Sequence, residues 1–385
     1  MLSTSAGAKW KRARNVLVLR VRLSLYIAGN WQDYLKCPTW QPNTSQKDIP
    51  MPHPSSNPTQ HTALKKWTVR SVVAVLSLVV LAVGGGALYQ MSASYLEERN
   101  IDLPGSFITV NGHDLYVNCQ GPTSKPFILL ENGLGVVTEN WFWVQDDLSS
   151  RYRVCAYDRA GTGNSAAIQG PVDAVVSADE LVLLLEKLGV TKPVMVVAHS
   201  YGALMARVFA QRHPARVAGL ILVDSSHEDM AERFPPVAQE GFEQMLNGFG
   251  ILETLNNFSG ARVMGVASLF SDGLAGAPFD RAYHLYASSH HMSGAALEAL
   301  GWDRSAAAAR AIKTLGDLPM TVMMVDGWDP IMLPSWTQMQ KELSTLSSVG
   351  RFVVIKEADH FGALNQQQYA RQVVREVELL ARDIF

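Results

Sequence analysis

The sequence predicts an α/β fold in which a mostly parallel sheet carries helices on both faces. Short apolar runs of strand length alternate with helical stretches through residues 105–385. Hydrophobic residues make up 48% of the chain and charged residues 18%, which is enough apolar material for a sizeable core. A second, different kind of apolar segment lies within the first hundred residues.

Eight apolar runs are expected to form the strands, at residues 106–110, 115–119, 126–130, 153–157, 194–197, 220–223, 321–325 and 352–355. Asn111-Gly112 is a hairpin signal between the first two, so the sheet should be mixed. An amphipathic helix over 367–384 should close the chain. Reactive groups in such sheets gather at the carboxyl ends of the strands.

The N-terminal apolar segment has the length of a membrane span. Residues 71–96 carry no charge, and 72–89 nearly fills the ~20 residues that cross a bilayer. Basic residues concentrate before it, which predicts a cytoplasmic N-terminus and export of the remainder. We expect a signal anchor over 67–90, then a linker over 91–104. The alternatives are a signal peptide cleaved after Ser94, which would release a secreted protein, and a buried core helix.

Residues 1–66 have the composition of a disordered, partly basic segment. The stretch 38–58 is rich in Pro, Ser, Thr, Asn and Gln. Met51 is an alternative start that would leave a short basic leader before the apolar segment.

Ser200 is the candidate nucleophile. It lies between a predicted buried strand and a predicted helix, with Ala198 and Gly202 as small neighbours. Such a tight, strained turn holds a serine hydroxyl out over the sheet. The first N–H groups of the following helix can stabilise an oxyanion there. The alternative is a serine at an ordinary turn.

With this motif, residues 105–385 resemble the α/β-hydrolase superfamily, whose members have an eight-stranded sheet and a helical cap, here expected at about 228–312. The resemblance implies that the N–H groups of Leu134 and Tyr201 form the oxyanion hole. Asn132 stands where the family usually has histidine. The segment 158–165 matches a structural signature of the family and should buttress the site.

The family's order of nucleophile, acid and histidine implies His360 as the base, because it is the only histidine after position 291. A solvated loop histidine is the alternative. The acid is expected to be Asp329, with Asp224 and Asp326 as alternatives, and the unused aspartates should cap turns. His199, beside the nucleophile, is interpreted as structural.

Two further features concern the cap and the cysteines. Most apolar residues of the cap should form its own core, while a few line an acyl pocket together with Trp141 and Trp143. Cys119 and Cys155 lie on strands that are neighbours in this family, so they form either a disulfide or two buried thiols. Cys37 would remain on the other side of the membrane.

We therefore expect hydrolysis of a small, apolar carboxylic ester or related acyl compound through a serine acyl-enzyme, on the non-cytoplasmic side of a membrane. No cofactor or metal is expected, and a net charge of −2 gives no sign of a nucleic-acid partner. The alternatives are an aminopeptidase or amidase, a cofactor-free haloperoxidase-like enzyme, and a non-catalytic membrane-tethered binding protein.

Overall fold

The computed structural model describes residues 58–385, and it gives no side-chain surroundings for residues 58–65. The expectations for residues 1–57, including the Met51 start and the place of Cys37, lie outside the described residues. The chain divides into two units, 1–69 and 70–385.

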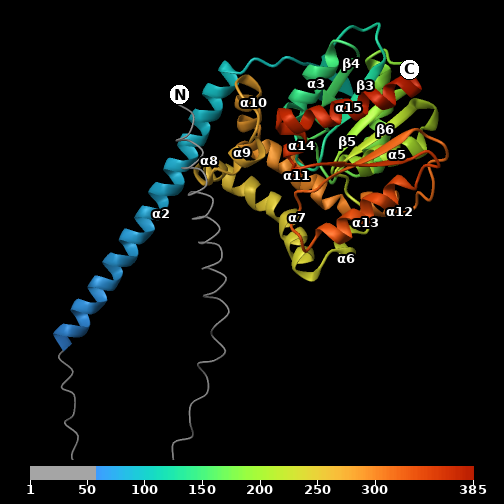
Figure 1. Cartoon of the computed structure of the whole chain (residues 1–385). Helices are drawn as coiled ribbons and strands as arrows, with labels where there is room; N and C mark the ends of the chain where they lie inside the picture. Colours follow the sequence, from blue (N-terminus) through green and yellow to red (C-terminus); the bar gives the residue numbers. More distant parts are fainter. Residues whose placement is uncertain (1–57) are drawn as a thin grey trace, which may run out of the picture. The chain divides into compact units, whose positions relative to one another are not determined.

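The N-terminal apolar segment is helical. Helix α2 (Pro58–Asn100) contains it, and its part from Lys66 to Asn100 is long and apolar enough to cross a membrane by length and composition (Figure 1). The linker expected at 91–104 is therefore helical as far as Asn100. Residues 91–100 contain neither proline nor glycine, so nothing in the sequence ends the helix earlier.

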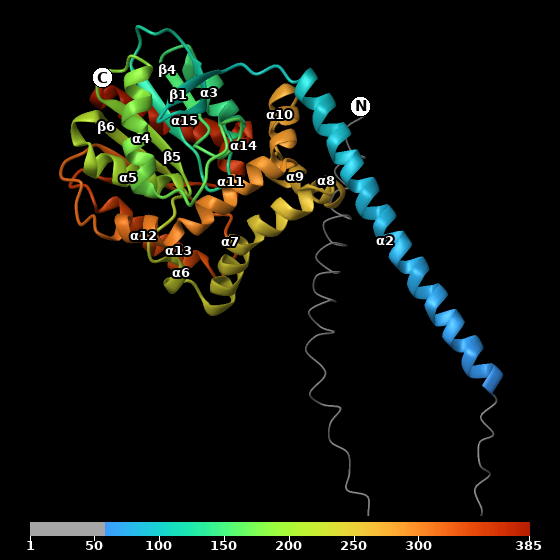
Figure 2. The ribbon, with the colours of Figure 1, turned by 180° about the vertical axis from the view of Figure 1, so that it is seen from behind.

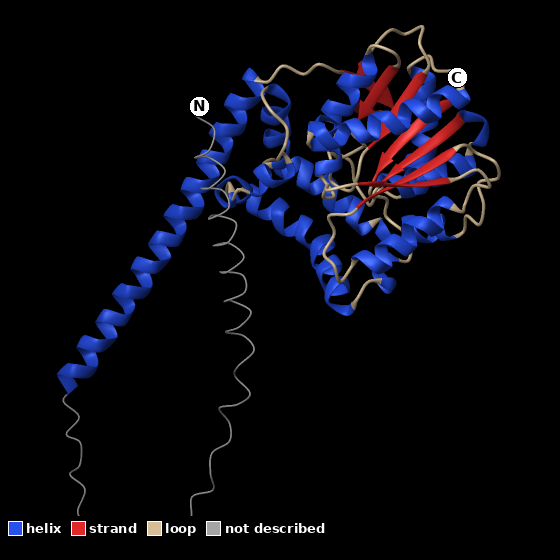
Figure 3. Cartoon of the chain, in the orientation of Figure 1, coloured by secondary structure: helices blue, strands red, loops and turns tan. Residues whose placement is uncertain are grey.

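Eight strands form one sheet in the order β1-β2-β4-β3-β5-β6-β7-β8. Figure 3 shows the strands in red between the blue helices. Their bounds are β1 Ser106–Val110, β2 His113–Gln120, β3 Phe127–Glu131, β4 Arg153–Tyr157, β5 Val194–His199, β6 Val217–Val223, β7 Met320–Val325 and β8 Arg351–Ile355. β1 pairs with β2 and β2 with β4 in antiparallel fashion, and every other pair is parallel. The sheet is therefore mixed, as the hairpin signal predicts.

Helices cover both faces of this sheet because its strands are apolar on both sides. In β5, Val194 and Val196 belong to one core cluster, whereas Met195 and Val197 belong to the other. One face packs against α4 (Ala174–Lys187), α5 (Gly202–Arg212) and α13 (Leu333–Ser344). The other packs against α3 (Phe142–Ser149) and α15 (Gln367–Ile384). Figure 1 shows α15 over one face, and Figure 2 shows α4 over the other.

A helical cap lies between β6 and β7. Its helices are α6 Met230–Arg233, α7 Pro236–Asn256, α8 Gly260–Met264, α9 Val266–Phe270, α10 Ala277–Tyr286, α11 Ser289–Leu300 and α12 Trp302–Arg310. A separate apolar cluster contains Phe249, Tyr286 and Met292 from the cap together with Val137 of the loop after β3. The cap thus has its own core, which continues into the loop above the sheet.

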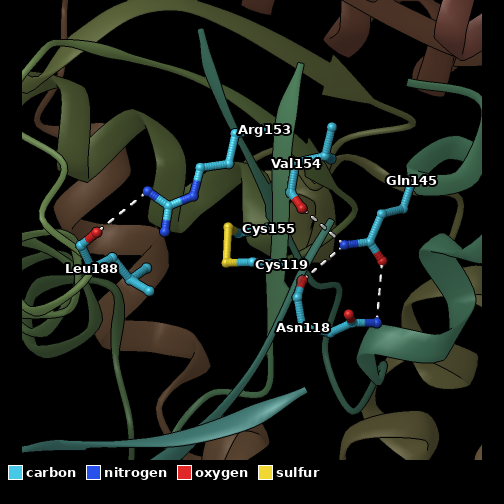
Figure 4. Close-up of a disulfide and its surroundings, with 7 residues drawn as sticks. All are labelled: Asn118, Cys119, Gln145, Arg153, Val154, Cys155 and Leu188. Atoms are coloured by element: carbon cyan, nitrogen blue, oxygen red, sulfur yellow. Dashed lines mark hydrogen bonds between the residues drawn. A yellow bond between two sulfur atoms is a disulfide. The ribbon is translucent and has the colours of Figure 1, made fainter. Parts of the chain in front are cut away.

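Cys119 and Cys155 form a disulfide between β2 and β4 (Figure 4). The two residues are direct partners in the antiparallel register. Beside them, the Gln145 side-chain amide donates to the carbonyl oxygens of Asn118, at 2.8 Å, and Val154, at 3.0 Å. Of the two alternatives for these cysteines, the structure has the disulfide.

Candidate active site

Ser200 occupies a strained turn between β5 and α5. Its φ is +52°, in the left-handed region that costs energy for a residue with a side chain. Its N–H donates to the carbonyl oxygen of Val223 at 3.0 Å, which fixes the turn against β6. A Cβ atom at position 202 would come within 2.4 Å of the carbonyl oxygen of Asn132, so only glycine fits there.

His360 bridges Ser200 and a carboxylate. Its Nε2 lies 3.0 Å from the Ser200 Oγ, and its Nδ1 lies 2.6 Å from Oδ2 of Asp224. Asp224 directly follows β6 and is fully buried, whereas the His360 side chain is 23% exposed. In this arrangement the imidazole can accept the proton of the serine hydroxyl, while the carboxylate orients the ring.

The expectation that Asp329 orients His360 is not met. Asp329 is exposed, and its Oδ1 accepts from the N–H of Ile331 at 2.9 Å. Asp326 Oδ1 accepts from the N–H of Glu357 at 2.6 Å. Both carboxylates are therefore held by backbone N–H groups of nearby turns, and the structure brings the alternative, Asp224, to the histidine.

Two tryptophans that the sequence analysis did not single out hold the Asp224 carboxylate. Trp336 Nε1 donates to Oδ1 at 2.8 Å, and Trp328 Nε1 donates to Oδ2 at 3.0 Å. The N–H of Val325 adds a third donor to Oδ1 at 3.2 Å. These three donors fix the position of the carboxylate beside His360. In the sequence, both tryptophans follow the seventh strand, and this is a signal that could have pointed to their contact with Asp224.

His199 supports His360 through the backbone. Its ring is fully buried, and its Nε2 lies 2.9 Å from the carbonyl oxygen of His360. Burial, together with the charge of the neighbouring His360, lowers the pKa of His199 well below its ordinary value. The neutral ring can therefore donate its Nε2 proton to that carbonyl. His199 thus has the structural place that the sequence analysis assigned to it.

The loop 132–135 lies against Ser200. A Cβ atom at position 133 would be 3.2 Å from the Cβ of Ser200, so the glycine allows the loop to approach closely. Asn132, in the position usually held by histidine, donates to the carbonyl oxygen of Tyr157 at 2.8 Å. In the described part of the chain, no acceptor takes the backbone N–H of Leu134 or Tyr201. Both remain available to an oxyanion.

Trp141 and Trp143, the two tryptophans predicted to line the substrate pocket, differ in burial. Trp141 is fully buried, and its Nε1 donates to Oδ1 of Asn132 at 2.9 Å. It fixes the loop and offers no surface to a substrate, so that expectation is wrong. Trp143 donates to the carbonyl oxygens of Asn365, at 2.8 Å, and Gly273, at 3.2 Å, which ties the cap to the region after His360.

A buried charged cluster supports the loop from below. Arg159 donates to the carbonyl oxygens of Asn132, at 2.6 Å, and Gly133, at 2.7 Å. Its guanidinium also contacts Glu131 and Glu298, each at 2.6 Å. Glu298 belongs to α11 of the cap, and its Oε2 accepts from the N–H of Gly135 at 2.9 Å. The segment 158–165 thus buttresses the site, and Glu298 is a contributor that the sequence analysis missed.

The charges within this cluster shift one another's pKa. Burial raises the pKa of Glu131, although the Arg159 charge acts in the opposite direction. Burial disfavours charged Arg159, but the two glutamates outweigh it and hold its pKa above the ordinary value. Among residues 66–385, whose side chains the structure describes, no group of three or more His, Cys, Asp and Glu side chains is arranged to hold a metal ion.

Comparisons with known proteins agree with this fold. The family model described as "alpha/beta hydrolase fold" matches residues 126–258. "AB hydrolase superfamily protein" of Gibberella zeae is 25% identical over 299 residues, which are 70% of this chain and 92% of that protein. "Probable transporter efuK" of Hormonema carpetanum is 33% identical over 135 residues, but these cover only 33% of this chain and 19% of that protein.

A solved structure with the same architecture is that of a thermophilic esterase from Thermogutta terrifontis. It superposes with a TM-score of 0.55 at 22% identity, covering 73% of this chain and 99% of the esterase. At this identity the likeness concerns the fold. Together with the family model and the sheet order, it shows that the chain has the α/β-hydrolase fold.

Proposed function

We propose that this protein is a serine hydrolase that cleaves a carboxylic ester or related acyl compound through an acyl-enzyme. The observation that carries the proposal is the continuous chain of contacts from Ser200 Oγ to His360 Nε2, at 3.0 Å, and from His360 Nδ1 to Asp224 Oδ2, at 2.6 Å. A serine at the nucleophile position distinguishes this chain from superfamily members that attack with aspartate.

The proposed reaction follows from this geometry. His360 accepts the Ser200 proton while the Oγ forms a bond to the acyl carbon. The N–H groups of Leu134 and Tyr201 stabilise the resulting oxyanion. When the tetrahedral intermediate collapses, the bond to the leaving group breaks, and His360 gives the leaving oxygen the proton. Water then attacks the acyl-enzyme with His360 again as base, which releases the acid and restores Ser200.

We propose that α2 anchors the enzyme in a membrane with the catalytic domain on the non-cytoplasmic side. The apolar helix and the basic residues before it support this orientation. The Cys119–Cys155 disulfide supports it independently, because such bonds persist in oxidising compartments. Gln90 and Glu97, on either side of the possible cleavage point after Ser94, both contact the cap, which favours an uncleaved anchor.

The test uses the full chain in detergent micelles, as wild type and as Ser200→Ala. Each is treated with a fluorophosphonate probe and with p-nitrophenyl esters of increasing chain length. We expect labelling and turnover in the wild type, with loss of a factor of ~10⁶ in kcat in the variant. If the wild type is labelled and cleaves aminoacyl anilides but not the esters, the amidase alternative is favoured. Absence of labelling and turnover in both proteins would favour a non-catalytic binding protein.

A further inference from the structure

The cap has an exposed apolar surface beside the end of the apolar helix. This cap-edge patch consists of Phe258, Val263, Met264 and Leu269. The side chain of Val263 is 80% exposed, and those of Met264 and Leu269 are 55% and 58% exposed. Apolar side chains gathered in one short segment are unusual on a water-exposed surface and often mark an interaction site.

Contacts between α2 and the cap begin at a defined point along the helix. Within the unit 70–385, helix residues 70–85 are exposed throughout. The partly or fully buried positions then follow at 86, 87, 90, 93, 94 and 97, which lie on one helical face. The helix is therefore bare along its most apolar part and is covered by the cap immediately beyond it.

The contact with the cap is close and specific. A Cβ atom at position 86 would come within 2.7 Å of the carbonyl oxygen of Phe258, so Gly86 allows the two backbones to meet. Ser259 Oγ donates to the carbonyl oxygen of Gly86 at 3.0 Å. Further along the helix, Arg262 Nη1 donates to Oε1 of Glu97 at 2.6 Å, with the arginine side chain only 5% exposed. These bonds fix the position of α8 along the axis of α2.

The point on α2 where the contact with α8 begins coincides with the expected edge of the hydrocarbon core of the bilayer. Residues 72–89 of a helix span about 27 Å, close to the ~30 Å core of a bilayer. Gly86 then lies near the outer boundary, and Tyr89, which is 57% exposed, lies where aromatic residues favour the interface. Because Phe258 meets Gly86, the part of the cap-edge patch at Phe258 is brought to the depth of the lipid headgroups and the first methylene groups.

We propose that the cap-edge patch is seated in the outer surface of the lipid bilayer that α2 spans. The inference depends on the proposed membrane insertion of α2 but not on the serine chemistry. Its occupant is lipid, because the patch is apolar and continues from a helix face that is itself apolar and bare. The segment also connects to the active site, since Phe270 at the end of α9 contacts Phe361, the neighbour of His360, with ring centroids 5.4 Å apart.

The test measures where a probe on the patch lies. The full chain with Cys37→Ser is labelled at Val263→Cys with an environment-sensitive fluorophore and reconstituted in phosphatidylcholine vesicles. Leu81→Cys, within the apolar helix, is the control for insertion. Val349→Cys is the matched surface control, because Val349 is 52% exposed and precedes β8 outside the cap. Lipids spin-labelled near the headgroup serve as quenchers for positions 263 and 349. Lipids spin-labelled near the end of the acyl chain serve for position 81, because it lies near the middle of the span.

We expect the probe at position 263 to lose roughly half of its emission to these lipids, because interfacial segments lie ~5–10 Å into the headgroup boundary. The probe at 349 should lose almost none. Quenching at 81 with none at 263 overturns the proposal, and so does the absence of quenching at 81. The proposal is also overturned if the probe at position 263 is shielded from water in detergent and the protein can be cross-linked as a dimer. That result would place a second copy of the chain on the cap-edge patch. Adding Ser200→Ala to the protein labelled at position 263 should leave the quenching unchanged. A failure of the proposed catalysis would therefore be distinguishable from a failure of this proposal.

Discussion

The Oδ2 atom of Asp224 lies 2.6 Å from Nδ1 of His360, the ring nitrogen opposite the one that contacts Ser200. This contact assigns the orienting carboxylate to the end of β6. Asp224→Asn should lower kcat by about 10⁴-fold, because an amide does not hold the imidazole in the required tautomer. Steady-state kinetics on a p-nitrophenyl ester measure the loss.

Asp329→Asn is the matched control for this variant, because Asp329 contacts the backbone of its own turn and not His360. It should retain activity within a few-fold of wild type. A large loss in Asp329→Asn with an active Asp224→Asn would return the acid to the turn after β7.

The buried Glu298 couples the cap to the loop 132–135. Its two oxygens accept from Arg159 and from the N–H of Gly135, and its side chain is fully buried. Glu298→Gln should lower the free energy of unfolding by about 3–5 kcal/mol, because it leaves a buried arginine partly uncompensated. Urea unfolding measures the change.

An exposed ion pair provides the comparison. Asp179 contacts Arg212 at 2.7 Å, with side chains 49% and 43% exposed. Asp179→Asn should cost only about 0–1 kcal/mol, because water and salt screen the pair. Equal losses in the two variants would show that burial does not determine the contribution of Glu298.

Gly202 is required by the close approach of the loop after β3. Gly202→Ala would place its Cβ 2.4 Å from the carbonyl oxygen of Asn132, so one backbone segment must move. We expect kcat to fall by about 10²–10³-fold, the usual effect of losing one oxyanion donor. Gly241 lies in α7, where an added Cβ would meet no neighbouring atom within 4 Å. Gly241→Ala should therefore keep its activity, and its free energy of unfolding should rise by up to about 1 kcal/mol. Full activity of Gly202→Ala would contradict the proposed oxyanion hole.

The disulfide should contribute strongly to stability, because it closes a loop between residues 36 positions apart. Replacing both Cys119 and Cys155 by alanine should lower the free energy of unfolding by about 4 kcal/mol on the chain-entropy estimate. Thermal unfolding with and without reductant provides the measurement, and Cys37→Ser is the control that leaves the bond intact. A wild-type melting curve that does not respond to reductant would argue against the bond.

His291 should make the protein sensitive to acid. Its buried Nδ1 accepts from the N–H of Gly163 at 3.0 Å, and burial lowers its pKa from 6.5 to about 4. Between these values the unfolded chain binds more protons than the folded one. The free energy of unfolding should therefore fall with decreasing pH, by at most about 1.4 kcal/mol per pH unit for this one group. The slope should be smaller in His291→Gln in urea titrations across this range, and equal slopes would exclude the contribution.

Much of the fold could be predicted from the sequence because its signals are local. Each strand is a short apolar run, and the turn at Ser200 shows itself by its small neighbours Ala198 and Gly202. These features depend on residues that are close in the chain, where backbone geometry and burial leave few choices. The base was predicted differently: His360 is the only histidine after position 291, and the resemblance to the family places the base last in the chain order.

Only the tertiary structure determined which residues far apart in the chain contact one another. Asp224 and Asp329 both follow strands, and those strands, β6 and β7, are neighbours in the sheet. Which carboxylate reaches His360 depends on the path of the chain after each strand and on the donors that Trp328 and Trp336 supply. The burial of Trp141 and the cap's contribution of Glu298 are likewise decided by packing between elements far apart in the chain, which no local pattern records.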